Sequence, residues 1–418
     1  MLPVLLVVAQ LADSVPTVSL EQAIARAARL DPAYVSALGQ LDNAGWVRRA
    51  ARLAFVLPSL TAGVDATTYS SPFFNPGTGR LQTSAVTARV AASYTVFSLR
   101  KFADLGATDA AHEAAAAGEV EQRFQTAMNT EADYYSVLAN QELLRVATER
   151  VNRAREQLAV ARERVTQGVA VQSDSLQVAL EETRAEIDSA RQGVALAVAR
   201  LQLGRRVGVA GAVAAQPLDT LQARALPVSL DDAVSLALRE GPAYRIVRAN
   251  ERAAGAALTG ARGEYLPQLT LAGANQSFDS RFYPEARNLS SLTLSVSLPI
   301  WTGGAREVAI SEARVARDVA RATREDAERA ARRDVTEAYE TYTTARDNYA
   351  QAIKALATAA ENFRVQDQRY RAGAATILEL VDAQVQLTQA GADVVQTRYA
   401  ARLALAGLES ILGRRLFS

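Results

Sequence analysis

The feature that most constrains this chain is an internal repeat, because its second half restates the first about 210 residues later. The segment Val18-Ser-Leu-Glu-Gln-Ala-Ile24 matches Val228-Ser-Leu-Asp-Asp-Ala-Val234. Further pairs follow in the same order: Leu57-Pro58 with Leu266-Pro267, Gln167-Gly168 with Ala372-Gly373, and Leu203-Gly204-Arg205 with Leu412-Gly413-Arg414. The sequence therefore predicts two structural repeats, at 17–204 and 228–413, with a linker at 205–227 and a C-terminal tail at 414–418.

Each repeat is expected to begin with one helix of roughly 35 residues. Ser19 and Ser229 are typical N-cap residues, since a serine oxygen accepts hydrogen bonds from free amides of the first turn. Proline disfavours helix in the residue before it, so Leu57-Pro58 and Leu266-Pro267 are expected to end these helices.

Strand patterns follow the helix in each repeat. Leu60, Ala62 and Val64 alternate with polar neighbours, and the same period of two recurs through 86–96 and 291–300. The predicted strands cover about 59–71, 83–98, 268–280 and 289–301. Such alternation gives a sheet with one apolar and one polar face, which places Arg89 on the polar face.

The remainder of each repeat has the spacing of a heptad seam. Apolar residues step by three and four from Leu144 to Val165 and from Val335 to Phe363. A helix from about 100 to 167 would be roughly 100 Å long, which no compact globule of this size accommodates. Gly168 and Gly373 are expected to end these helices in the left-handed conformation and to turn the chain back along a second helix.

Composition argues against catalysis and against nucleic acid as a partner. The chain has no cysteine and a single histidine, and its net charge is +1. These counts exclude disulfides, thiolate metal sites, histidine clusters and a basic footprint for nucleic acid. The sequence also has no glycine-rich phosphate loop. We therefore expect no enzyme, no catalytic residue, no metal and no cofactor.

Four strands cannot close a barrel, yet each is long enough to cross a bilayer, which takes about ten residues of tilted strand. Open sheet edges are not tolerated in lipid, so several chains are expected to share one closed barrel. Residues 1–12 have the apolar character of a signal segment whose true start lies upstream. The alternative for this segment is a short apolar arm.

Two motifs carry a resemblance to the TolC-like outer membrane efflux proteins. One is Leu298-Pro-Ile-Trp-Thr-Gly-Gly304, which is similar to the strand-to-helix junction of that family. The other is the hairpin segment from Tyr370 to Ala383, with a weaker counterpart from Arg164 to Leu176. The resemblance covers essentially the whole chain through the order and spacing of its motifs.

The resemblance implies an internally duplicated α+β membrane protein in the outer membrane of a Gram-negative-type bacterium. Three chains would form a twelve-stranded β-barrel with four transmembrane strands from each, and their coiled-coil helices would form a long periplasmic α-helical barrel. The implied function is a passive exit duct of a tripartite efflux or type I secretion system. The implied partners are a periplasmic adaptor (membrane fusion) protein, an inner-membrane transporter of the RND, ABC or MFS type, and outer membrane lipid. The alternative is a soluble periplasmic coiled-coil scaffold without a pore.

The resemblance also implies three groups of site residues. The periplasmic entrance constriction would contain Glu379, Asp382, Asp174 and Tyr370. The hairpin tips that dock the adaptor would contain Gly168, Val169, Gly373 and Ala374, and the strand-helix junctions would contain Pro58, Pro267, Pro299, Trp301, Gly303 and Gly304. The alternative for the three carboxylates is that they only lie in the first turns of their helices, where the helix dipole stabilises a negative charge. Tyr94, Phe97 and Trp301 are expected either in an aromatic belt at a membrane interface or in ordinary packing.

Overall fold

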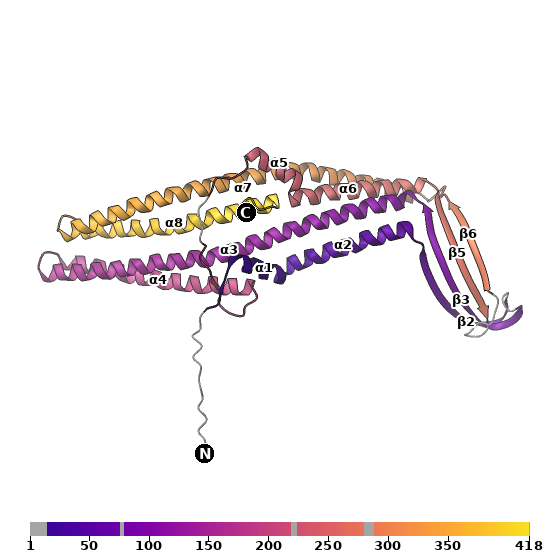
Figure 1. Ribbon diagram of the computed structural model, residues 1–418, viewed down its shortest axis with the longest axis horizontal. Helices are drawn as coiled ribbons and strands as arrows, with labels where there is room; N and C mark the ends of the chain where they lie inside the picture. Colours follow the sequence, from indigo (N-terminus) through magenta and orange to yellow (C-terminus); the bar gives the residue numbers. More distant parts are fainter. Residues whose placement is uncertain (1–14, 76–78, 219–223, 280–287, 418) are drawn as a thin grey trace, which may run out of the picture. The chain divides into compact units, whose positions relative to one another are not determined.

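The computed structural model describes residues 15–75, 79–218, 224–279 and 288–417, so the predicted signal segment at 1–12 lies outside it. Its elements are shown in Figure 1. The helices are α1 (Leu20–Leu30), α2 (Pro32–Val56), α3 (Leu99–Thr166), α4 (Gln172–Arg206), α5 (Leu230–Glu240), α6 (Pro242–Arg262), η1 (Gly263–Tyr265), α7 (Ala305–Arg371) and α8 (Ile377–Leu412). The strands are β1 (Thr17–Val18), β2 (Ser59–Asn75), β3 (Arg80–Phe97), β4 (Ala214–Ala215), β5 (Gln268–Asp279) and β6 (Asn288–Ser297).

The first helix of each repeat is broken, which corrects the prediction of one helix of roughly 35 residues. Ser19 and Ser229 cap α1 and α5 as expected, accepting from the amides of Gln22 and Asp232. A new helix then begins at Pro32, because Asp31 accepts hydrogen bonds from the following amides as an N-cap does. Proline suits a first helical position, where its missing N–H costs nothing. The break repeats at Pro242.

Two compact units divide the chain. One comprises Met1–Ala37, Glu119–Pro242 and Ala330–Ser418, and the other comprises Leu38–Gly118 and Ala243–Arg329. Each sequence repeat contributes to both units, and α3 and α7 each supply residues to both. We call them the hairpin unit and the sheet unit.

The sheet unit contains an antiparallel sheet in the order β2-β3-β5-β6. Its register pairs Leu60 with Ala92, Gly273 with Leu292, and Leu271 with both Tyr94 and Leu294. Paired residues share a face, so Leu60, Tyr94, Leu271, Leu292 and Leu294 lie on one side. The polar residues Ser59, Arg89 and Thr293 lie on the other side. Farther along β5 and β6 the pattern changes, since Asn275 and Ser277 lie on the first side and Leu289 lies on the other. The last strand ends at Ser297, earlier than predicted, since Pro299 cannot donate to a strand pair.

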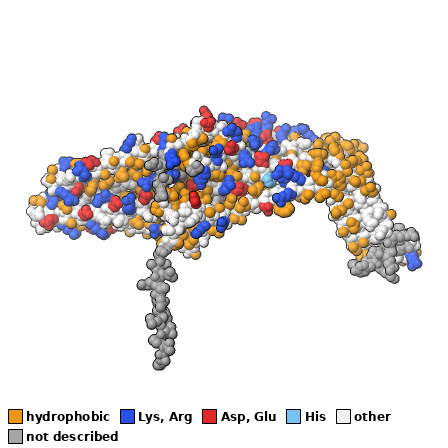
Figure 2. Space-filling model, in the orientation of Figure 1, with side chains coloured by type: hydrophobic (Ala, Val, Ile, Leu, Met, Phe, Trp, Pro, Cys, Tyr) orange, Lys and Arg blue, Asp and Glu red, His pale blue; other side chains and the backbone are white. Residues whose placement is uncertain are grey.

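Much of the apolar side of this sheet is not covered by the described residues, although Val86 is only 8% exposed. Leu60, Leu292 and Leu294 are 74%, 77% and 62% exposed. Figure 2 shows hydrophobic side chains gathered where the helices of the sheet unit meet the sheet. Among the described strands, none pairs with the outer edges of β2 or β6. None of the helices in the described ranges combines the length and the apolar character that crossing a membrane requires.

The hairpin unit pairs α3 with α4 and α7 with α8 in helical hairpins (Figure 1). The predicted seam of α3 is buried, with Val151, Ala154, Leu158 and Ala161 each at most 6% exposed. Apolar residues along the return helix α4 are exposed, with Leu176 at 63% and Val194 at 65%. The buried face of α4 combines the apolar Val178, Leu196 and Leu203 with Glu181 and Ala185. One apolar stripe of α4 therefore has no cover from the part of the chain that the structure describes.

The segment predicted as a linker contains β4, which pairs in parallel with β1. The hydroxyl of the fully buried Tyr134 shares its single proton between the carbonyl oxygens of Gln216, at 2.7 Å, and Val18, at 3.3 Å. This clamp fixes the start of the first repeat against the segment that follows it.

Candidate functional site

The two hairpin tips have the same backbone geometry. Gly168 and Gly373 have φ angles of +74° and +76°, a conformation open to glycine without strain. At the first tip the amide of Val169 donates to the carbonyl of Arg164 at 3.0 Å, and at the second the amide of Ala374 donates to Arg369 at 2.8 Å. These bonds confirm the left-handed helix stops expected from the sequence. Both glycines, Val169 and Ala374 are exposed.

An arginine that the sequence analysis did not single out joins the two tips. Arg164 of the first hairpin donates to the carbonyl oxygen of Tyr370 in the second, and its guanidinium lies 4.7 Å from the Tyr370 ring centroid. Its counterpart in the second repeat, Arg369, donates to Ala374 within its own hairpin at 3.1 Å. An arginine stands four residues before each tip glycine, and this repetition was the sequence signal that could have identified the contact. The two arginines nevertheless bind different partners.

Tyr370 lies in the contact between the hairpins. It is 3% exposed and packs with Leu158, Val178, Ile377 and Leu380. Among the described residues its hydroxyl has no hydrogen-bond partner. Burial raises the pKa of Tyr370, and the charge of Asp174 raises it further while Arg164 lowers it. The structure thus brings Asp174 of α4 near Tyr370 of the other hairpin.

The remaining two acidic candidates occupy a different position. Glu379 completes a capping box at the start of α8, where its carboxylate accepts from the amide of Thr376 at 3.0 Å and its own amide donates to the Thr376 hydroxyl at 3.3 Å. Asp382 is exposed one turn later and accepts from Gln386 at 2.7 Å. Glu379 therefore stabilises the first turn of α8, which is the alternative role considered in the sequence analysis. Its carboxylate is also exposed to solvent.

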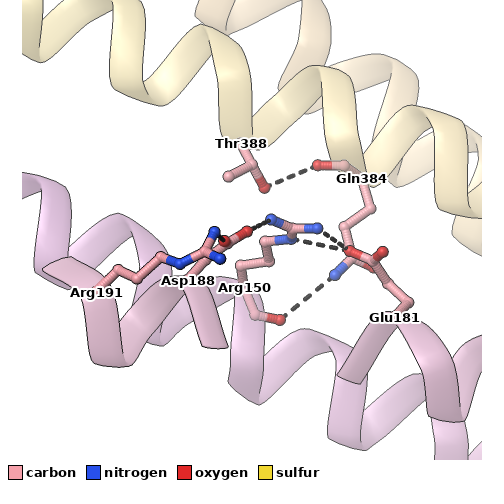
Figure 3. Close-up of polar contacts among 6 residues, drawn as sticks. All are labelled: Arg150, Glu181, Asp188, Arg191, Gln384 and Thr388. Carbon is pink, nitrogen blue, oxygen red and sulfur yellow. Dashed lines mark hydrogen bonds and ion pairs between the residues drawn. The ribbon is translucent and has the colours of Figure 1, made fainter. Parts of the chain in front are cut away.

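A second polar contact between the hairpins lies farther from the tips (Figure 3). The Nε of Arg150 on α3 donates to Glu181 on α4 at 2.9 Å, and its Nη1 donates to Asp188 at 2.8 Å. The side chain of Glu181 is only 5% exposed. Gln384 on α8 is fully buried and donates to the carbonyl oxygen of Arg150 at 3.4 Å. This contact fixes the register of the hairpins at one level.

The strand-helix junctions are turns held by side chains. Gly303 and Gly304 have φ angles of +67° and +86° before α7 begins. Arg306 donates to the carbonyl of Pro299 at 3.1 Å and lies 3.8 Å from the centroid of the Tyr265 ring. Trp301 is 79% exposed beside this turn. Pro58 and Pro267 precede β2 and β5, where each connects a helix to a strand.

Comparisons with known proteins agree with this architecture. Residues 233–414 match the family model of the outer membrane efflux proteins. Three similar solved structures are CusC (18% identity, TM-score 0.80, covering 94% of this chain and 92% of CusC), the outer membrane protein VceC from Vibrio cholerae (16%, 0.80, 95% and 97%) and the MtrE outer membrane channel from Neisseria gonorrhoeae (18%, 0.78, 95% and 89%). The comparison with curated protein sequences gives no match. The structural matches extend the likeness over the first repeat, which the family model does not reach.

Proposed function

We propose that the chain forms an outer membrane channel of an efflux system, because residues 233–414 match the family model of the outer membrane efflux proteins. The fold of the whole chain supports this, because it matches solved outer membrane channels over nearly its full length. The duct is passive: it conducts cargo outward and carries out no catalysis.

The observation that carries the proposal is the one-sided sheet. Four strands present an uncovered apolar face and an opposite polar face, and both outer edges are open. A lipid-facing sheet needs an apolar exterior, and its edge strands must pair with something. Further copies of this chain pair with the outer edges of β2 and β6, and the polar face of the sheet then faces the lumen.

We propose that three chains close this barrel. The exposed stripe on α4 supports assembly from further copies, because Leu176, Leu180, Ile187 and Val194 follow helical spacing and are each at least 48% exposed. A stripe of this kind is covered when the hairpin of a neighbouring chain packs against it.

The hairpin tips form the periplasmic entrance in this proposal. Three copies of the exposed Asp382 and Glu379 would make negative rings, which favour cations at the constriction. The Arg164–Tyr370 contact, with Asp174 close to it, holds the two hairpins of one chain together at the same level. The exposed tips at Gly168 and Gly373 are the surfaces offered to a periplasmic adaptor, and an inner-membrane transporter would supply the energy.

A matched pair of arginine substitutions tests the membrane placement of the sheet. Leu292 and Thr293 are adjacent near the middle of β6 and lie on opposite faces. Leu292→Arg should cost about 2–4 kcal/mol for each strand at the bilayer midplane, whereas Thr293→Arg should be tolerated in the lumen. We expect outer membrane fractions to lose the assembled Leu292→Arg protein and to retain Thr293→Arg. Equal assembly of both variants would refute the lipid-facing sheet and favour the soluble scaffold.

A further inference from the structure

The feature of the sheet unit that still lacks an explanation is the exposed face of α2. None of the 25 residues of this helix is buried. Its counterpart in the second repeat, α6, contains the buried Ala249 and Leu258, which are 0% and 4% exposed. Trp46, Leu53 and Leu57 follow helical spacing on α2 and are 60%, 58% and 54% exposed. This α2 stripe has no cover among the described residues.

A second stripe of the same kind lies near the start of α7. Val308, Val315 and Val319 form this α7 stripe, at 57%, 60% and 60% exposed, and they have the same helical spacing of seven and four residues. Ion pairs join α2 to α3, α3 to α6, and α6 to α7, through Arg48–Asp109, Arg252–Glu113 and Arg324–Glu251. This helix order follows the strand order β2-β3-β5-β6, so both stripes belong to the outer helices of the unit.

The duplication of the chain gives a register in which the two stripes can meet. The carbonyl oxygen of Val18 accepts from the Tyr134 hydroxyl at 3.3 Å, and that of Val228 accepts from the Tyr339 hydroxyl at 3.3 Å. The same contact therefore recurs with an offset of 205 residues between α3 and α7 and of 210 residues between the segments before α1 and α5. The prolines that begin α2 and α6 keep the offset of 210.

These offsets carry the α3–α6 contact inside the chain onto a contact between α7 and α2. Gly260 of α6 packs so closely on α3 that a Cβ at Gly260 would lie 3.2 Å from that of Ala103. The equivalent residues are Ala50 on α2 and Val308 on α7. Because α2 and α7 are the two outer helices of one sheet unit, this contact requires α2 of another copy.

Side-chain size is complementary across that contact. Within the chain, Leu99 fills the space beside Gly263, where an added Cβ would lie 2.8 Å from the Leu99 Cβ. The equivalent pair exchanges the sizes, because Leu53 corresponds to Gly263 and Gly304 corresponds to Leu99. A Cβ at Gly304 would meet no described atom within 4 Å, so there is room beside it for the exposed Leu53 of a neighbour.

We propose that the α2 stripe of one copy packs against the α7 stripe of the next, in the register of the α3–α6 contact. This inference rests on the proposed assembly of three chains and assigns the surfaces that join their sheet units. Trp46 lies one turn from Ala50 and is then level with the segment between Val308 and Val315, where a large aromatic side chain serves as an anchor. The two surfaces differ, so the contact is heterologous and closes a ring when it repeats around an axis.

A cysteine pair tests this register in a chain that has no cysteine of its own. Ala50 and Val308 are exposed, so Ala50→Cys combined with Val308→Cys leaves the buried core unchanged. Oxidation of this double variant in isolated outer membranes should convert most of it into disulfide-linked dimers and trimers, which reduction returns to single chains. Each single variant should stay uncrosslinked, because equivalent positions do not face each other at a heterologous contact.

Two further cysteine pairs are the matched controls. Ala50→Cys with Val315→Cys keeps the same stripe but moves one cysteine about 10 Å along α7, beyond the roughly 7 Å between Cα atoms that a disulfide spans, so it should not crosslink. Gly106→Cys with Ala256→Cys should form a disulfide within one chain, since the two Cβ atoms would be 3.6 Å apart.

Trp46→Ala tests the anchor without a new covalent bond. Loss of an aromatic anchor should weaken the association of the chains about thirtyfold at each contact and lower the temperature at which the trimer dissociates, whereas Trp46→Phe should retain most of the association. Absent crosslinking of the Ala50–Val308 pair, equal crosslinking of the Val315 pair, or unchanged dissociation of Trp46→Ala would overturn the proposal. Any of these results in a trimer extracted by detergent leaves the channel standing, whereas a soluble wild-type monomer refutes the channel as well.

Discussion

Replacing Arg150 by methionine is expected to loosen the hairpin unit strongly. Glu181 is 5% exposed and Arg150 is 14% exposed, so the variant leaves a buried carboxylate without its cation (Figure 3). Removing one partner of a buried pair costs about 3–5 kcal/mol. Asp188, the second partner of Arg150, is itself a carboxylate and cannot replace the cation that Glu181 loses.

Amide hydrogen exchange on the full chain measures this cost locally. A loss of 3–5 kcal/mol corresponds to about 10²- to 10⁴-fold faster exchange if the opening of α4 around Glu181 becomes that much easier. Asp188→Asn is the matched control and should change exchange less than about fivefold, because its pair with Arg150 is half-exposed. The double variant Arg150→Met, Glu181→Met should recover most of the protection, since apolar replacements of a buried pair are often nearly neutral. Exchange of Arg150→Met within threefold of wild type, or a double variant as unprotected as the single one, would refute the reasoning.

Three further predictions follow from the hairpin unit. Glu379→Gln should keep the capping box yet lower the preference for cations in bilayer recordings. Glu379→Ala should lower that preference and also destabilise α8 by about 1 kcal/mol. Unchanged ion selectivity in both variants would show that Glu379 does not line the entrance. Burial raises the pKa of Glu131 although Arg415 opposes it, so the folded state binds the proton more tightly and loses stability as pH rises above the ordinary glutamate range. The Tm of wild type minus that of Glu131→Gln should therefore fall as the pH rises above about 4.5, and a rise would contradict the desolvation argument. Leu180→Ser, on the exposed stripe of α4, should lower the dissociation temperature of the trimer, and an unaltered oligomer would exclude that stripe from the interface.

Local signals in the sequence were sufficient for most elements of the fold. The serine caps, the tip glycines and the alternating strands each depend on residues close together in the chain, and all three appear in the structure. The break at Pro32 was also readable, because Asp31 followed by proline is a helix start, but the continuous apolar pattern obscured it. Thr376 and Glu379 likewise have the spacing of a capping box, so the structural role of Glu379 was accessible from sequence.

Long-range partners could not be predicted in the same way. A heptad seam identifies an apolar face without saying which helix covers it, so the exposure of Leu176 and Val194 on α4 required the structure. Arg164 and Arg369 occupy equivalent places in the two repeats, yet only Arg164 crosses to the other hairpin. The pairing of β3 with β5 joins the two repeats and brings Tyr94 and Leu271 to the same side of the sheet, which no single strand pattern specifies.

The mass of the particle extracted from isolated outer membranes in mild detergent tests the central claim most directly. The shared barrel predicts a particle of three chains that requires detergent for its release, since the apolar sheet face is uncovered in one chain. A monomer or dimer recovered without detergent would contradict the channel, because the sheet would then lie outside the membrane.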